Sequence, residues 1–226
     1  MRNTARITTK GLRRWESGHP WIYRSDVAER PEVDAGVVLV RDSRNRPLGW
    51  ALWSPKSEIS LRLIEANTDI EIDGSWWQRK IEQAMSRRVG LETVTNAYRV
   101  VHGEADGCPS LVVDRYDRWA VVQLMSAGLE SFRKEIVDAV AHVTRVDGIL
   151  ARNDSALRGK EGLPRETVAL HGEVPHEIEV GEYGIRYIAA PYTGQKTGAF
   201  LDQRENRHLA GNVAKGVALD CFSYHG

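Results

Sequence analysis

The sequence predicts a mixed fold: a small β barrel or sandwich first, an α+β unit in the middle and the start of an α/β unit at the end. Short strand-like apolar runs dominate residues 1–72. Two helical patterns, near 75–89 and 132–143, alternate with further strand-like runs. A third helical pattern precedes a brief apolar run at 217–219, which suits a buried strand.

The composition indicates a globular protein without membrane attachment. The chain has 226 residues, 42% hydrophobic and 27% charged, which is enough to bury a core in more than one small domain. No apolar run approaches the length of a membrane span, and residues 1–10 lack the hydrophobic segment of a signal peptide. We therefore expect a cytoplasmic location.

The sequence favours neither a disulfide framework nor a metal site. Cys108 and Cys221 are the only cysteines, so free thiols are expected. His102 and His171 each precede a Gly-Glu pair, but neither belongs to a motif with metal-ligand spacing. We expect no bound metal.

The N-terminal part of the chain is expected to contain a hairpin and carries an excess of basic residues. Residues 36–41 and 48–53 flank a polar turn, and residues 58–64 alternate apolar and polar side chains. The formal net charge is zero, yet residues 1–64 hold 12 Lys and Arg against 7 Asp and Glu. A basic segment is typical of a phosphate-binding module, although chance asymmetry on a solvated surface gives the same pattern.

Residues 10–24 read KGLRRWESGHPWIYR, which mixes arginines with aromatic side chains. RNA recognition needs cations to neutralise phosphates and flat rings to stack on unpaired bases. Trp21 and Tyr23 suit the core of a barrel equally well, and we expect them there. The candidate RNA-binding residues are Lys10, Arg13, Arg14 and Arg24.

The middle of the chain predicts an α+β unit. Ser75 is the expected N-cap of a helix that runs to about Val89, before Gly90. Strands are expected at 98–102, 111–114, 119–125 and 148–151, with the second helix between the last two. The polar stretch Asn153–Glu161 is expected to be a solvated connector, although its basic residues also suit a surface facing RNA.

The last part of the chain is organised around Gly194–Arg207, GQKTGAFLDQRENR. Two glycines bracket a polar turn, and a helix with one apolar face is expected to follow and to end at Lys215-Gly216. The residues assigned to that face are Phe200, Leu201, Leu209 and Val213. A strand that ends in an acidic residue and a glycine turn, as at residues 217–226, presents a crevice to nucleotide-like ligands in α/β folds. A phosphate-binding P-loop is not favoured, because Gln195 and Ala190 occupy two of its glycine positions.

Four stretches carry a resemblance to one family. GQKTGAFLDQR followed by ALDCFSYHG is similar to the class I S-adenosylmethionine-dependent ribosomal RNA methyltransferases with an N-terminal PUA domain, a group that includes 23S rRNA cytosine-5 methyltransferases. KGLRRWESGHPWIYRSDV, HGEADGCPSLVVDRY and NDSALRGKEGL resemble earlier landmarks of that family in the same order. The resemblance implies a PUA-like β barrel over 1–72, a central α+β domain over 73–185, and the first part of a Rossmann-like methyltransferase domain over 186–226.

The resemblance also implies ligands and a site. It implies S-adenosylmethionine as cofactor and ribosomal RNA as partner, and it leaves a homodimer open. One wall of the cofactor site would be Lys196, Thr197, Phe200, Gln203 and Arg204, with Arg204 holding the methionine carboxylate. The loop under the cofactor would be Asp220, Phe222, Ser223, Tyr224 and Gly226.

Departures from the family pattern limit what these residues are expected to do. The family has Thr-Gly-Gly where this chain has His225-Gly226, and its Asp-Pro-Pro motif and catalytic cysteine have no counterpart here. Cys108 and Cys221 are expected to be structural, and no catalytic residue is assigned, so this chain alone is expected to be inactive. The alternative is a non-catalytic RNA-binding module built from the PUA and central domains.

Overall fold

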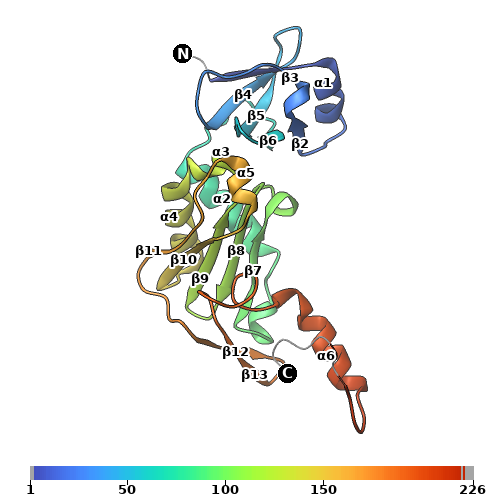
Figure 1. Cartoon of the computed structure of the whole chain (residues 1–226), viewed down its shortest axis with the longest axis vertical. Helices are drawn as coiled ribbons and strands as arrows, with labels where there is room; N and C mark the ends of the chain where they lie inside the picture. The colour runs from blue at the N-terminus through green and yellow to red at the C-terminus, as the bar shows by residue number, and fades with distance from the viewer. Residues whose placement is uncertain (1–2, 220, 222–226) are drawn as a thin grey trace.

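The computed structural model describes residues 3–219 and Cys221, which form three parts in succession (Figure 1). A six-stranded sheet lies at one end, a five-stranded sheet with its helices lies in the middle, and a two-stranded hairpin with the last helix lies at the other end. The termini of the described chain therefore belong to opposite ends of the molecule. None of the helices in these residues is long and apolar enough to cross a membrane.

The N-terminal sheet has the strand order β2-β6-β5-β4-β1-β3. Its strands are β1 (Thr4–Ile7), β2 (Trp21–Tyr23), β3 (Val27–Glu29), β4 (Gly36–Arg41), β5 (Pro47–Trp53) and β6 (Ile59–Glu65). The expected hairpin is confirmed, since β4 and β5 pair antiparallel. Helix α1 (Thr9–Glu16) and the 3-10 turn η1 (Arg24–Asp26) connect the first strands. Alternating residues of the strands fill a core with buried Ile22, Val38 and Trp53.

The central sheet has the order β11-β10-β9-β8-β7. Its strands are β7 (Ala97–His102), β8 (Leu111–Tyr116), β9 (Trp119–Leu124), β10 (Gly148–Asn153) and β11 (Glu166–His171). Within this sheet, β9 and β10 are the only strands of the described residues that pair in parallel, and the connection between them carries the short helix α3 (Ala127–Glu130) and helix α4 (Arg133–Thr144). The 3-10 turns η2 (Leu91–Thr93) and η3 (Gly103–Asp106) flank β7.

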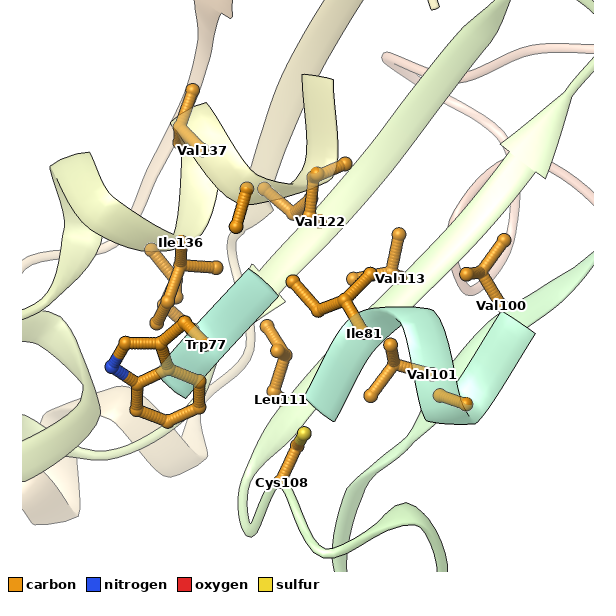
Figure 2. Packing of buried hydrophobic residues seen from close by; sticks show 14 of the residues in the cluster. Trp77, Ile81, Val100, Val101, Cys108, Leu111, Val113, Val122, Ile136 and Val137 are labelled. Carbon is orange, nitrogen blue, oxygen red and sulfur yellow. The ribbon is translucent and has the colours of Figure 1, made fainter. Parts of the chain in front are cut away.

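Helices α2 (Gly74–Ser86) and α4 supply one side of the central core. Figure 2 shows Trp77 and Ile81 of α2 and Ile136 of α4 facing Leu111 and strand residues of the sheet. All four of these side chains are fully buried. The expected helical and strand periodicities therefore meet in one apolar layer, as an α+β unit requires.

Two local expectations in the central unit were wrong. The N-cap of the first helix is Asp73, whose carboxylate accepts from the Trp76 amide at 2.8 Å, and Ser75 lies inside the helix. The stretch Asn153–Glu161 is no simple connector, because β10 runs through Asn153 and helix α5 (Leu157–Glu161) follows. Arg158 is fully buried there and donates to the carbonyl oxygens of Leu124 and Pro164.

The C-terminal part begins with the hairpin of β12 (Ile178–Glu182) and β13 (Ile185–Ala189). Its turn has Tyr183 and Gly184 at φ of 49° and 82°, the left-handed conformation that two-residue hairpin turns use. Ile178 pairs with Ala189, so one hairpin spans the boundary that was expected between residues 185 and 186. The 3-10 turn η4 (Leu201–Gln203) and helix α6 (Arg204–Val213) follow, so the helix starts later than residue 200.

The last helix does not bury the apolar face expected for it, and the strand expected at 217–219 is not observed. Leu209 and Val213 of α6 are 62% and 67% exposed. Val217 and Leu219 are exposed, and the described residues 214–219 form no strand. Cys221 is exposed rather than buried, whereas Cys108 is buried as expected.

A buried ion pair joins the N-terminal sheet to the central unit. Arg62 of β6 and Glu161 of α5 are each 6% exposed, and Arg62 Nη2 lies 2.7 Å from Glu161 Oε1. Burial alone would raise the pKa of Glu161, but Arg62 and the hydroxyl groups of Ser57 and Ser54 outweigh it and lower that pKa from its ordinary value of 4.5. The junction therefore stabilises the ionised form of Glu161 beside Arg62 over its protonated form.

Replacing Glu161 by alanine should destabilise the chain by about 3–5 kcal/mol at neutral pH, because it leaves Arg62 charged and buried without its partner. The folded-state pKa of Glu161 is lowered, so its contribution is complete above about pH 4.5 and is lost as the pH falls through the lower folded value. Urea unfolding at several pH values measures this difference.

The exposed pair Lys134–Asp138 on α4 provides the control. Asp138→Ala should cost less than about 1 kcal/mol, because solvent screens an exposed ion pair. An equal loss in the two variants would contradict a stabilising role for the buried junction.

Candidate functional site

The loop between β13 and η4 is held against the central sheet by Asp114. This aspartate of β8 is 1% exposed and accepts two hydrogen bonds from Arg99 of β7, at 2.8 and 2.9 Å. It also accepts from the hydroxyl of Thr197 at 2.6 Å. A buried carboxylate is tolerated only when such donors surround it, so the position of Thr197 is strongly determined.

The proton of the Thr197 hydroxyl sets the direction of a short hydrogen-bond chain. Since Thr197 donates to Asp114, Tyr116 must donate to Thr197 Oγ1, which lies 2.9 Å from the tyrosine oxygen. The same tyrosine oxygen accepts from the Ala199 amide at 3.2 Å. Burial, with the nearby charge of Asp114, raises the pKa of Tyr116, so the tyrosine keeps the proton that it donates.

A second anchor lies on β10. Buried Arg152 donates to the carbonyl oxygens of Pro191 and Gly194 at 2.7 and 2.9 Å. A Cβ on Gly194 would lie 2.5 Å from the carbonyl oxygen of Gly198, so only glycine fits in this turn. Lys196 has a φ of 55°, a conformation that costs energy and recurs at functional sites.

Five of the predicted cofactor residues lie in one segment, formed by this turn, η4 and the start of α6. Their side chains do not all face the surface of that segment. Lys196 Nζ lies 2.7 and 2.8 Å from the Asp202 carboxylate oxygens and 4.8 Å from the centre of the Phe200 ring. The hydrogen bond from Lys196 lowers the pKa of Asp202. Gln203 is exposed, whereas Thr197 is 1% exposed and lies beneath the turn. Thr197 therefore positions the turn and is not part of its surface.

Arg204 is held by its neighbour in the first turn of α6. Its Nε donates to Glu205 Oε1 at 2.9 Å, and Glu205 also accepts from the hydroxyl of Tyr183. The other half of the predicted site, Asp220, Phe222, Ser223, Tyr224 and Gly226, lies outside the residues that the structure describes.

Lys196 and Arg204 face a groove of about 780 Å³ between this segment and the central unit. The opposite wall comes from the end of α2, from β7 and from η3, and it carries basic residues that the sequence analysis did not single out. These residues are Arg87, Arg88, Arg99 and His102. The adjacent arginines near the end of the expected helix were the available signal, but nothing in their sequence context connects them to residue 196.

The carboxylate of Asp106 lies at the centre of that wall. Burial would raise its pKa, but hydrogen bonds from Arg88, from the backbone of His102 and from Arg87, together with the charge of Arg88, lower it. Arg87 Nη1 and Arg88 Nη2 lie 2.9 and 2.5 Å from Asp106 oxygens. One negative charge is thus shared by two arginines.

The predicted RNA-binding residues lie on α1 and η1, where some of them stabilise the fold. Arg14 Nε lies 2.9 Å from Asp26 and the guanidinium stacks over Tyr23, while Arg24 donates to the backbone oxygens of Lys56 and Ser57. The more accessible cations are Lys10, 67% exposed and 3.5 Å from Asp26, and exposed Arg13.

The expected burial of Trp21 and Tyr23 in the barrel is wrong. Both side chains are half-buried. Trp21 lies at the junction with the central unit, where its Nε1 donates to Glu104 of η3 at 2.8 Å. Among residues 3–219 and 221, no three His, Cys, Asp or Glu side chains form a group that could hold a metal ion.

Known proteins match this chain both in its N-terminal domain and in the fold of nearly all its residues. Residues 5–66 match the family model of the PUA-like domain. Two solved structures share the fold over 94% of this chain and 54% of their own, at 21% identity: a putative SAM-dependent methyltransferase from Streptococcus mutans, with a TM-score of 0.78, and a putative methyltransferase complexed with SAH, with a TM-score of 0.79. The mixed fold with an N-terminal PUA-like domain is thereby confirmed.

Curated relatives are similar over nearly the whole chain. The Ribosomal RNA large subunit methyltransferase I of Alteromonas mediterranea is 40% identical over 223 residues, which are 96% of this chain and 55% of the relative. The protein of the same name from Tolumonas auensis is 38% identical over 92% of this chain and 54% of its own length. The chain therefore spans about half the length of the curated relatives that it matches.

Replacing Thr197 by valine should destabilise the chain by about 1–3 kcal/mol, because Asp114 and Tyr116 each lose a buried partner. The Ala199 amide, which depends on the Tyr116 oxygen, should exchange its hydrogen faster. Urea unfolding and amide exchange measure the two effects.

The matched control is Thr193→Val, since Thr193 is exposed in the same loop. This change should alter the free energy of unfolding by less than about 0.5 kcal/mol. Unchanged exchange of Ala199 in the Thr197 variant would show that the hydroxyl chain does not hold the loop.

Proposed function

We propose that this chain is part of an S-adenosylmethionine-dependent methyltransferase that acts on ribosomal RNA, with carbon 5 of a cytosine in 23S rRNA as the acceptor. The observation that carries the proposal is the anchored segment that presents Lys196 and Arg204 to the groove. The names of the curated relatives and the PUA-like match over residues 5–66 support ribosomal RNA as the substrate. The cofactor supplies an activated methyl group on its sulfonium, so the protein's task is positioning.

The described residues fit a cofactor with a carboxylate and an apolar part. The Arg204 guanidinium, oriented by Glu205, suits a charge-assisted pair with the methionine carboxylate. Phe200 is half-buried beside Lys196 and provides a flat apolar surface. Gln203 at the exposed end of η4 offers an amide. For residues 220, 222–224 and 226, we propose the role of the loop under the cofactor on the resemblance alone.

Methylation at carbon 5 of cytosine needs a thiolate that adds to carbon 6. Cys108 does not suit this role, because it is buried and burial raises its pKa to about 12. We place the nucleophile in the half of the curated relatives that this chain does not span. The 226 residues alone are accordingly expected not to transfer the methyl group.

A non-catalytic RNA-binding module is the second candidate, favoured by the accessible cations Lys10 and Arg13 on α1. The two candidates differ in cofactor affinity. A module needs no cofactor and should bind RNA in a salt-dependent manner without it.

Calorimetric titration of the chain with S-adenosylmethionine should show binding, and Arg204→Ala should weaken it about 10- to 100-fold, because one charge-assisted hydrogen bond is lost. Arg186→Ala is the control, since Arg186 is an exposed arginine of β13 that pairs only with Glu179 in the described structure. Absence of binding in the unchanged chain would favour the module.

A methylation assay on hypomethylated ribosomal RNA tests whether the nucleophile lies outside these 226 residues. We expect no transfer by the 226-residue chain and transfer by a longer chain read from the same gene, because the nucleophile is assigned to the additional residues. Transfer by the short chain would refute that assignment.

A further inference from the structure

The groove beside Lys196 and Arg204 has more positive than negative charge. Its lining includes five Lys and Arg side chains and three aspartates, with His102 in addition. Lys196 is balanced by Asp202, and Arg99 is balanced by Asp114. The excess lies where Arg87 and Arg88 share Asp106, at the junction of α2 and η3.

The single negative charge of Asp106 cannot neutralise both Arg87 and Arg88. One of its oxygens accepts from Arg87 and Arg88, and the other accepts from Arg88 and the His102 amide. Arg88 is tied further to the carbonyl oxygens of Ala84 and Arg99. Arg88 is therefore the structural partner of Asp106, and Arg87 is the less constrained of the two.

Arg87 has donors to spare for a ligand. Its side chain is 58% exposed, and in the described structure its hydrogen bonds to Asp106 and to the Ala105 carbonyl both use Nη1. Nε and Nη2 remain, and together they form the planar fork that recognises phosphate oxygens. Exposed His102 lies beside it on the same wall.

We infer that the wall formed by Arg87 and His102 binds the phosphodiester backbone of the RNA substrate next to the cofactor. The inference rests on the proposed function for the identity of the RNA. The acceptor base must approach the segment that holds the cofactor, and the groove joins this wall to Lys196 and Arg204. A backbone phosphate near the acceptor base would then meet the one part of the groove whose arginines outnumber their carboxylates.

The test uses fluorescence anisotropy with a short labelled single-stranded RNA, measured across a range of salt concentrations. Arg87→Ala should weaken binding about 3- to 10-fold and lower the slope of log affinity against log salt by about 0.7, the value for one phosphate contact with a single strand. Arg87→Glu should weaken binding further, and Arg87→Lys should keep most of the salt dependence. These charge variants separate loss of contact from loss of fold.

Arg79→Ala is the matched control, because Arg79 is an exposed arginine of α2, the helix that Arg87 follows, and does not line the groove. It should change RNA affinity less than about twofold. Polyglutamate is the second probe, and failure to compete with RNA supports a phosphate-specific wall. Equal competition by polyglutamate, or an RNA affinity unaffected by Arg87→Ala and Arg87→Glu, overturns the inference.

Titration of the same variants with S-adenosylmethionine distinguishes this inference from the proposed function. Cofactor binding that is normal in all Arg87 variants, with weakened RNA binding, supports both. Normal cofactor binding without any change in RNA binding refutes only the phosphate wall. Loss of RNA affinity in the Arg87 variants of a chain that does not bind the cofactor supports the wall and refutes the methyltransferase assignment.

Discussion

The buried carboxylate of Asp114 is the constraint on which the candidate site depends. It lies on β8, beside the edge strand β7, and needs donors that the sheet itself supplies only in part, through Arg99. Thr197 supplies the remaining donor from a segment 83 residues away in the chain. An unpaired buried charge is far more costly than a strained turn, so the loop accepts Lys196 in a left-handed conformation to deliver that hydroxyl.

A comparable arrangement joins the N-terminal domain to the other end of the central unit. The buried pair of Arg62 and Glu161 is supplemented by hydrogen bonds from the Ala127 and Gly128 amides to Glu161 and Ser54. Trp21 adds a polar contact to Glu104 in η3, the turn that also contributes Asp106 to the groove. The PUA-like domain therefore contacts the element that positions part of the groove, and the two surfaces are structurally connected.

Patterns that depend on neighbours in sequence were predicted well, and features that depend on distant partners were not. The strands at 36–41 and 48–53 follow from alternation, and the hairpin follows from its turn. The helix at Leu157–Glu161 was missed because Arg158 is buried only by virtue of carbonyl oxygens supplied by residues such as Leu124. A strand at 217–219 was expected from a short apolar run followed by an acidic residue and a glycine turn, but a strand also needs a partner edge, which a local pattern does not specify. Arg87 was missed because the groove brings it opposite a segment more than a hundred residues away.

Polar and stacking contacts, and not the burial of an apolar face, fix the position of helix α6 and of Arg204 at its start. Arg207 and His208 face the β12–β13 hairpin, where Arg207 donates twice to Glu182 at 2.8 and 2.6 Å and His208 stacks on Tyr183. Helical spacing puts Leu209 and Val213 on the opposite side, so hydrophobic burial does not orient the helix. Glu182 is 3% exposed, so it requires Arg207 much as Asp114 requires Thr197. The segment that carries Lys196 and Arg204 is thus held at both ends by buried carboxylates, and this arrangement sets the spacing of its two cations along the groove.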